Sequence, residues 1–275
     1  MLKIAYVDIG ELGWSLYLSA RIRWLKKNAD SMVAVIGLPD RRCLWEGLAD
    51  DIIDVPKLFY EKYDLKRQDN YRLRKMRWGE FKDFFLPYIP AGYRFAEPNE
   101  YPSNINNDNR VFEPYRYSKP PENGREIIVF PRCRIELWGK RNLSENFYLQ
   151  LIKRLCYEFP RLTVRTIGTK NGAYDIKTDK FNYINWVGKS KDLQDLIDKC
   201  QSAIVAVGSQ SGPPKISLLQ GVPTFMIGHE KKRHVISENW MDTKIGFYEV
   251  DRREYERINI DDCIQAIIAF VKEVQ

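Results

Sequence analysis

Residues 203–228 read AIVAVGSQSGPPKISLLQGVPTFMIG, and this stretch decides the fold. The apolar residues Ala203–Val207 predict a buried strand, which leads through Gly-Ser-Gln-Ser-Gly into a helix over Pro214–Leu219. Gly221 ends that helix, and Thr224–Ile227 has the composition of the next strand. Strands and helices that alternate in this way are typical of a parallel α/β sheet.

The same alternation continues on both sides of this stretch, but not through residues 60–122, which are rich in Pro, Asn, Tyr and Arg. Upstream strands are predicted over Ile4–Ile9, Met32–Gly37, Asp51–Val55, Ile127–Phe130 and Leu162–Ile167, and helices over Trp14–Lys27, Arg42–Leu48 and Asn146–Glu158. We therefore expect two Rossmann-like α/β domains, residues 1–122 and residues 123–275, with a central cleft between them.

The composition indicates a globular protein with anionic partners. Of 275 residues, 44% are hydrophobic and the formal net charge is +7, which favours nucleotides, phosphorylated sugars, nucleic acid or an acidic membrane face. The five cysteines are scattered, which indicates reduced thiols and a cytoplasmic location. No stretch approaches the roughly 18 apolar residues of a membrane span.

The turn between Val207 and the following helix has the features of a phosphate site. Its small residues allow backbone N–H groups to approach a ligand, and a helix N-terminus favours an anion. Ser209, Ser211 and Lys215 add hydroxyl donors and a positive charge. The alternative is a strand-to-helix turn that needs glycine only for its geometry, because a glycine-rich turn is a weak signal.

Two tripeptides in this stretch carry a family resemblance. Ser211-Gly212-Pro213 and Gly221-Val222-Pro223 resemble the C-terminal signature of the heptosyltransferases, family nine of the glycosyltransferases. Members of that family show Asp-Ser-Gly-Pro, a helix and Gly-Val-Pro at this separation. In this chain Gln210 replaces the usual Asp, so a negative charge beside the donor site is lost.

Two further blocks resemble the same family. Phe130-Pro131, followed by Lys140-Arg141 before a helix, matches its layout, although Arg132 replaces the usual Gly. Trp186-Val187-Gly188-Lys189 resembles the family's Gly-Lys loop near the nucleotide. The resemblance implies that Lys140 contacts the donor diphosphate, where a cation stabilises charge on the leaving group. The donor-binding residues implied in this way are Arg132, Lys140, Arg141, Gly188, Ser209, Gln210, Ser211, Gly212 and Lys215. The alternatives are a solvated Lys-Arg pair and a plain scaffold loop.

The first predicted strand-to-helix loop carries the candidate catalytic carboxylates. Asp8-Ile-Gly-Glu-Leu-Gly13 precedes a helix, and relatives place a Gly-Asp pair here whose carboxylate acts as a base or contacts the acceptor. We therefore expect Glu11 to be the general base, with Asp8 as the reserve candidate. The alternative is that Glu11 lies at a helix N-terminus because the helix dipole favours an acid there.

The resemblance implies the GT-B fold, with a reduced N-terminal domain. It also implies an enzyme that moves a sugar from a nucleoside-diphosphate donor to a hydroxyl of a glycan or glycolipid acceptor. The expected reaction is inverting and needs no cofactor besides the donor. Because no Asp-x-Asp motif occurs, we also expect no metal ion. Peripheral contact with an anionic membrane surface fits the charge, whereas nucleic acid is not an expected partner.

Two alternatives remain open for function and one for the aromatic stretch. A sugar-nucleotide epimerase or hydrolase would share the fold, and a non-catalytic module could bind an anionic glycan or RNA through Lys66–Arg77. The aromatic and basic stretch 60–118 is expected to form part of the acceptor surface. Its alternative role is to close a small core in a reduced domain.

Overall fold

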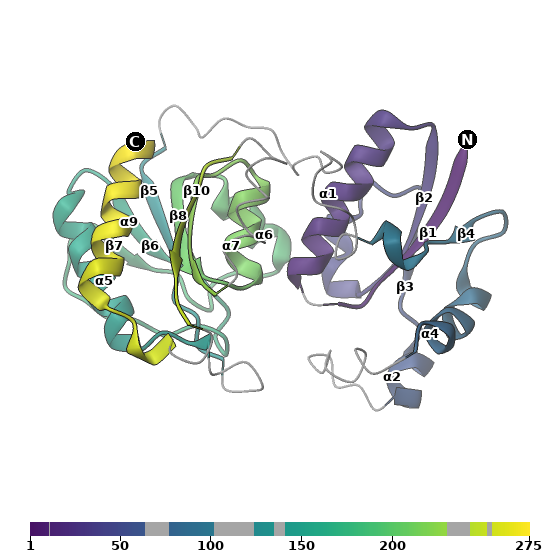
Figure 1. Cartoon of the computed structure of the whole chain (residues 1–275), viewed down its shortest axis with the longest axis horizontal. Coiled ribbons are helices and arrows are strands. Elements are labelled where there is room, and N and C mark those ends of the chain that lie inside the picture. The colour runs from purple at the N-terminus through teal and green to yellow at the C-terminus, as the bar shows by residue number, and fades with distance from the viewer. Residues whose placement is uncertain (11, 64–76, 102–123, 135–140, 230–242, 252–254) are drawn as a thin grey trace. The chain divides into compact units, whose positions relative to one another are not determined.

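The computed structural model describes residues 1–10, 12–63, 77–101, 124–134, 141–229, 243–251 and 255–275. The chain divides into two compact units, Met1–Tyr115 and Arg116–Gln275, each with its own sheet (Figure 1). The predicted boundary at residues 122 and 123 falls in the segment 102–123, outside the described residues, so it stays a prediction. None of the helices in the described ranges is long and apolar enough to cross a membrane.

The first unit is built on a four-stranded parallel sheet in the order β3-β2-β1-β4. Its strands are β1 (Leu2–Asp8), β2 (Ser31–Gly37), β3 (Asp51–Asp54) and β4 (Arg94–Phe95). β1 and β2 are almost continuously apolar, which is typical of parallel strands covered on both faces. Helix α1 (Leu12–Asn28) connects β1 to β2, as the sequence predicted.

The other face of this sheet is covered by α2 (Lys57–Tyr63) and α4 (Trp78–Phe85), which are followed by the 3-10 helices η2 (Leu86–Tyr88) and η3 (Pro98–Glu100). Phe85 and Phe95 are buried against Val7 and Ile36, and Trp78 and Phe81 pack at the edge of this cluster. The expectation that the aromatics of residues 60–118 line an acceptor surface is therefore wrong for Phe85 and Phe95. They close a small core, because the short sheet leaves this face to aromatic side chains. Residues 64–76 and 102–118 lie outside the described residues.

The second unit is built on a six-stranded parallel sheet in the order β10-β9-β8-β5-β6-β7. The strands are β5 (Glu126–Phe130), β6 (Thr163–Thr166), β7 (Tyr183–Asn185), β8 (Ala203–Ser209), β9 (Thr224–Gly228) and β10 (Ile245–Glu249). Counted along the chain, this is the strand order 3-2-1-4-5-6 of a dinucleotide-binding Rossmann fold. The strand order reverses between β5 and β8, and ligands of such sheets bind beyond the carboxyl ends of the strands at that point.

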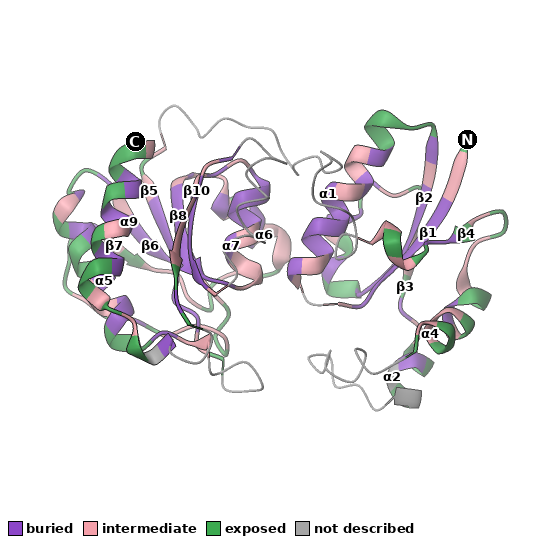
Figure 2. Cartoon of the chain, in the orientation of Figure 1, coloured by how far each residue is buried: buried purple, intermediate pink, exposed green. Residues whose placement is uncertain are grey.

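Among the described residues, helices cover both faces of the second sheet (Figure 1). Helices α5 (Glu145–Glu158) and α9 (Ile260–Val274) pack on one face, and α6 (Leu193–Cys200) and α7 (Gly212–Leu219) on the other. α5 begins where the Ser144 hydroxyl accepts a hydrogen bond from the Phe147 N–H at 3.1 Å. The burial colouring follows these layers, with purple strands inside and green patches on the outer helix faces (Figure 2).

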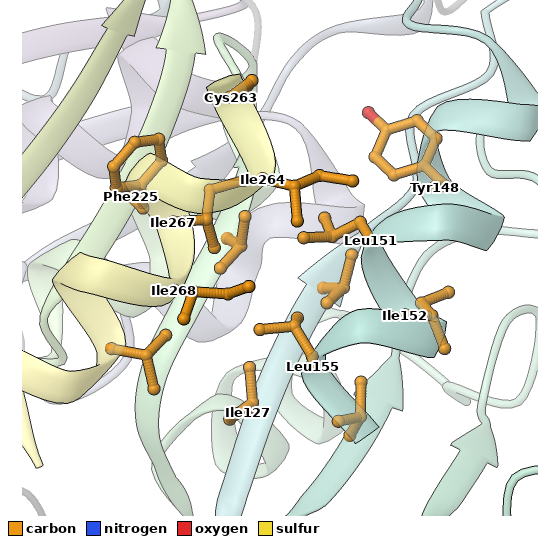
Figure 3. Close-up of a cluster of buried hydrophobic side chains, with 14 of the residues drawn as sticks. Ile127, Tyr148, Leu151, Ile152, Leu155, Phe225, Cys263, Ile264, Ile267 and Ile268 are labelled. Atoms are coloured by element: carbon orange, nitrogen blue, oxygen red, sulfur yellow. The ribbon is translucent and has the colours of Figure 1, made fainter. Parts of the chain in front are cut away.

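The core of the second unit lies between its sheet and the helices α5 and α9. Isoleucines of α9 face leucines of α5 across Ile127 of β5 (Figure 3). Each fully buried aliphatic side chain of this kind contributes about 1.5–3 kcal/mol relative to exposure. Tyr148 lies at the edge of the cluster, and its hydroxyl points away from Leu151 and Ile152. The apolar core of the second unit therefore ends near Tyr148, toward the carboxyl ends of the strands.

The structure differs locally from the sequence analysis at η1 and at β10. In place of a helix over Arg42–Leu48, the chain forms the 3-10 helix η1 (Pro39–Leu44), which begins with a proline at its first position. Strand β10 was not predicted from the sequence, and its second residue, Gly246, is of a type that ordinarily weakens a strand. A Cβ at Gly246 would lie 2.3 Å from the Phe225 ring, so glycine is needed there for close packing on β9.

Candidate functional site

The candidate donor site lies at the carboxyl ends of β5 and β8, where Phe130 pairs with Gly208. A Cβ at Gly208 would lie 2.6 Å from Pro214 of α7 and 3.1 Å from Phe130. Glycine therefore allows α7 to begin close against the end of β5. The two loops that follow β5 and β8 consequently start side by side.

The loop after β5 is fixed to the loop after β6 by backbone hydrogen bonds. The Tyr174 N–H donates to the Pro131 carbonyl at 2.7 Å, and the Cys133 N–H donates to the Gly172 carbonyl at 2.9 Å. Arg132, between them, forms an antiparallel bridge with Ala173. These bonds hold the Arg132 backbone in place without any ligand.

Asn142 closes the other side of this loop. Its Oδ1 accepts hydrogen bonds from Arg132 Nη1 at 2.8 Å and from the Arg134 N–H at 3.0 Å. Its Nδ2 donates to the Arg134 carbonyl at 2.7 Å. One carboxamide thus ties together the two ends of the segment 135–140, which itself lies outside the described residues. Lys140, the expected diphosphate contact, belongs to that segment.

Arg132 is a nearly buried cation, with 7% of its surface exposed. Burial, the largest cause, and the neighbouring Arg134 and Arg141 guanidinium groups together lower its pKa to about 10, although Tyr148 and Tyr255 oppose the shift. Like charges gathered around a desolvated guanidinium create a strongly positive local potential. The arrangement is suited to bind an anion.

Two buried hydroxyls lie beside Arg132. Burial raises the pKa of Tyr148, and the neighbouring Ser209 hydroxyl and Arg132 partly offset that rise. Neither Tyr148 Oη nor Ser209 Oγ has a hydrogen-bond partner among the described residues. Buried hydroxyls without partners are rare in folded proteins, so each is a donor available to a bound group.

Ser211 is the N-cap residue of α7, and its hydroxyl donates to the Ser209 carbonyl at 3.0 Å. Gly212 occupies the first helical position, followed by Pro213 and Pro214, which have no N–H. Only Ser211 and Gly212 therefore offer backbone donors in the first turn, where a helix ordinarily leaves about four N–H groups unpaired. This helix N-terminus is a weaker anion site than one without prolines.

Gln210 connects β8 to the end of β9. Its N–H donates to the Ile227 carbonyl at 2.8 Å, and its Oε1 accepts from the His229 N–H at 3.0 Å. A Cβ at Gly228 would lie 2.5 Å from Gln210 Oε1, so the carboxamide crosses the strand end at close range. His229 Nδ1 lies 3.1 Å from the hydroxyl of Tyr255. Gln210 thus organises the backbone of this edge.

Of the other expected donor-binding residues, Gly188 lies in the loop after β7 and Lys215 lies on α7. Gly188 has φ of 72° and donates its N–H to the Gly168 carbonyl at 2.8 Å, which fixes the loop after β7 to the loop after β6. Lys215 is half-buried on α7. Lys189 donates to the Asn185 carbonyl at 2.7 Å, so this lysine stabilises its own loop.

In the first unit, Asp8 ends β1 at the corresponding strand-order reversal, between β1 and β4. Its carboxylate is 4% exposed, and burial raises its pKa to about 6 although the Arg41 guanidinium opposes that rise. Arg41 Nη1 donates to the Gly10 carbonyl and to Ser15 Oγ, both at 2.5 Å. Glu11, the expected base, lies outside the described residues between Gly10 and Leu12.

The structure thus brings Arg132, Arg141, Ser209 and Gln210 to one edge of the second sheet. It adds three residues that the sequence analysis did not identify: Asn142, Tyr148 and Tyr255. None of them belongs to a recognisable motif, although Asn142 directly follows the Lys-Arg pair. In the described part of the chain, no three His, Cys, Asp or Glu side chains gather as metal ligands would.

No protein-family model matches the chain, and no characterised protein is detectably similar to it in sequence. Solved structures are similar over the whole length. The glycosyl transferase of family 9 from Veillonella parvula has a TM-score of 0.61 at 13% identity, covering 98% of this chain and 97% of its own. The ADP-heptose LPS heptosyltransferase II of E. coli has a TM-score of 0.64 at 12% identity, covering 99% of each chain.

The E. coli heptosyltransferase WaaC, solved with ADP, is similar with a TM-score of 0.57 at 10% identity, and the match covers 99% of this chain and 100% of WaaC. The chain has the GT-B fold of the family 9 glycosyltransferases and heptosyltransferases.

Proposed function

We propose that this protein is a glycosyltransferase that moves a sugar from a nucleoside-diphosphate donor to a hydroxyl acceptor. The observation that supports it most is the positive, partly desolvated edge of the second sheet at the point where the strand order reverses. Nucleotides bind to Rossmann sheets at such points. The solved structures of the same fold are glycosyl and heptosyl transferases, one of them with ADP.

The donor diphosphate is assigned to the carboxyl ends of β5 and β8. The residues proposed to bind it are Arg132, Lys140, Arg141, Gly188, Ser209, Gln210, Ser211, Gly212 and Lys215. When the bond from the sugar to the diphosphate breaks, negative charge develops on the leaving oxygen. Preorganised cations stabilise that charge in the transition state more than in the ground state.

The proposed chemistry is inverting. The acceptor oxygen attacks the anomeric carbon from the face opposite the diphosphate, a carboxylate takes the acceptor's proton, and the nucleoside diphosphate leaves. Glu11 is the proposed base, and Asp8 is the reserve candidate because it ends the central strand β1. The carboxylate ends as a carboxylic acid, so no further reactant is required.

We further propose that the reaction is independent of a metal ion, because the guanidinium groups of Arg132 and Arg141 supply positive charge at the donor site. The proposed acceptor is a glycan or glycolipid, and the net charge of +7 suits an anionic membrane surface that carries it. A cytoplasmic location is proposed with it. EDTA should leave transfer unchanged, and a loss of activity that Mg²⁺ or Mn²⁺ restores would contradict this part.

The proposal is tested first by a thermal-shift panel of ADP-, GDP-, UDP-, CDP- and dTDP-sugars. A ligand at a hundred times its Kd stabilises the native state by about 2.7 kcal/mol, which raises Tm measurably. At least one donor should raise Tm, and the same donor should release its nucleoside diphosphate when an acceptor is added. No shift with any donor, together with salt-sensitive RNA binding, would indicate a binding module instead.

A further inference from the structure

The first turn of α7 lacks half of the backbone donors that would ordinarily hold an anion, because Pro213 and Pro214 occupy it. A diphosphate at this edge therefore needs another source of positive charge and hydrogen bonds. Arg132 lies two residues after the end of β5, the strand that pairs with β8 in the sheet. It is also the position at which this chain departs from the glycine of the families it resembles.

We infer that Arg132, together with the hydroxyls of Tyr148 and Ser209, binds the diphosphate of the donor and replaces the missing donors of α7. This inference rests on the proposed function and adds to it the group that recognises the diphosphate. Tyr148 and Ser209 approach from α5 and β8, and Arg132 from the end of β5, so the three come from three separate elements. Polar side chains that converge from several elements are typical of ligand-binding sites.

The guanidinium is oriented before any ligand binds. Asn142 accepts from Nη1 at 2.8 Å, and the Arg132 backbone is bridged to Ala173, so few rotamers remain to be fixed on binding. A planar guanidinium can also donate two parallel hydrogen bonds to phosphate oxygens, whereas an ammonium group cannot. The site therefore predicts a preference for diphosphate over a single phosphate.

Desolvation explains why the contact should be strong. The Arg132 guanidinium is largely withdrawn from water among the like charges of Arg134 and Arg141, and its pKa is lowered for that reason. An anion that arrives there relieves the repulsion and meets two hydroxyls that have no partner among the described residues. Charge-assisted hydrogen bonds away from water are the stronger kind.

The test is isothermal titration of wild type and Arg132→Gln with inorganic pyrophosphate, with the nucleoside diphosphate that stabilises wild type most, and with the corresponding nucleoside. We expect Arg132→Gln to weaken diphosphate and pyrophosphate binding roughly ten- to a hundredfold and to leave nucleoside binding unchanged. Arg134→Gln is the matched control, because it removes the same charge from an exposed side chain two residues along the loop. It should weaken diphosphate binding less than threefold.

Two milder variants keep the inference testable if Arg132→Gln does not fold. Tyr148→Phe removes only a hydroxyl and should weaken diphosphate binding about two- to fivefold. Arg132→Lys should also lose affinity for the diphosphate, because an ammonium group cannot donate two parallel hydrogen bonds. If wild type binds the diphosphate, and Tyr148→Phe and Arg132→Lys bind it as tightly as wild type does, the inference is overturned while the proposed function stands. Equal losses in Arg132→Gln and Arg134→Gln would also overturn it. If wild type binds no nucleoside diphosphate, the proposed function itself fails.

Discussion

The guanidinium of Arg41 lies 3.9 Å from the carboxylate of Asp8, and both side chains are buried at the carboxyl end of β1. Arg41 reaches this position from the 3-10 helix η1, where it also contacts Gly10 and Ser15. The pair therefore joins three segments of the first unit. Burial nevertheless outweighs the attraction, so the pKa of Asp8 is raised to about 6.

The raised pKa of Asp8 predicts a pH dependence of stability. Because its folded pKa is about 6 and its ordinary value is 3.8, the folded state binds more protons between these values, and stability falls as pH rises through that window. The loss is on the order of 3 kcal/mol above pH 6. Asp8→Asn removes this contribution. Its free energy of unfolding in urea should therefore rise relative to that of wild type between pH 4 and pH 7.

The control is Asp40→Asn, which removes an exposed carboxylate in the same neighbourhood. Because the Asp40 charge is one of the smaller causes of the raised pKa of Asp8, the stability of Asp40→Asn relative to wild type should change with pH much less than that of Asp8→Asn over the same range. A constant difference between Asp8→Asn and wild type from pH 4 to pH 7 would contradict the assignment of a raised pKa to Asp8.

A second prediction concerns the coupling between Asp8 and Arg41. Removing Arg41 leaves a buried carboxylate without its cation, which is costly only when the carboxylate is ionised. A double-mutant cycle of Asp8→Asn and Arg41→Gln should give a favourable coupling of about 1–3 kcal/mol at pH 8 and almost none at pH 4. The contacts of Arg41 with Gly10 and Ser15 are lost in both arms, so they cancel. Coupling of the same size at both pH values would show that the pair is not ionic.

Much of the fold can be predicted from local sequence, because each apolar strand or amphipathic helix shows its pattern within a single segment of the chain. The predicted helix over Asn146–Glu158 forms as α5 (Glu145–Glu158), and the predicted strand over Thr224–Ile227 forms as β9 (Thr224–Gly228). β4 was not predicted, since two residues, Arg94 and Phe95, become a strand only by pairing with Ile4 and Ala5. Such pairing is a long-range property that no local composition encodes.

The candidate site was predictable where a motif marks it and not where side chains meet from distant segments. Ser211 and Gly212 were identified from their turn. Tyr148 looks like an ordinary residue of an amphipathic helix, and its role depends on the end of β8, about sixty residues later in the chain. His229 and Tyr255 meet across 26 residues of sequence. The predictions for Glu11 and Lys140 stay predictions, because both lie outside the described residues.

Asn142 offers a test of the loop that carries Arg132. Asn142→Ala removes three hydrogen bonds, so the free energy of unfolding should fall by about 1–3 kcal/mol. Nucleoside-diphosphate affinity should fall as well, because Arg132 is no longer oriented before binding. Asn146→Ala, at an exposed position of α5, is the control for both titration and urea unfolding. Unchanged affinity in Asn142→Ala would show that the orientation of Arg132 is not limiting.

Gly208 is a position at which close packing of the backbone limits the site. In Gly208→Ala, the new methyl group would press on Pro214 and Phe130, so overpacking should cost about 1–3 kcal/mol and weaken nucleotide binding. Gly79→Ala is the control, since nothing lies within 4 Å of its Cβ and alanine favours helix α4. Thermal unfolding and titration of both variants check this. A Gly208→Ala protein with wild-type Tm and affinity would contradict the close packing of β5 and α7.

The last prediction separates the two candidate bases. Glu11→Gln keeps the size of the side chain and removes its capacity to accept a proton, so transfer should fall roughly a hundredfold or more while donor binding stays nearly intact. Asp8→Asn should retain most of its transfer activity, because its carboxylate is buried and bound into the contacts around Arg41. The measurement is kcat for sugar transfer, with donor affinity from titration as the control for each variant. If Glu11→Gln turns over normally and Asp8→Asn does not, the base is Asp8. The lower limb of the pH–rate profile should then lie near pH 6, the raised pKa of that group.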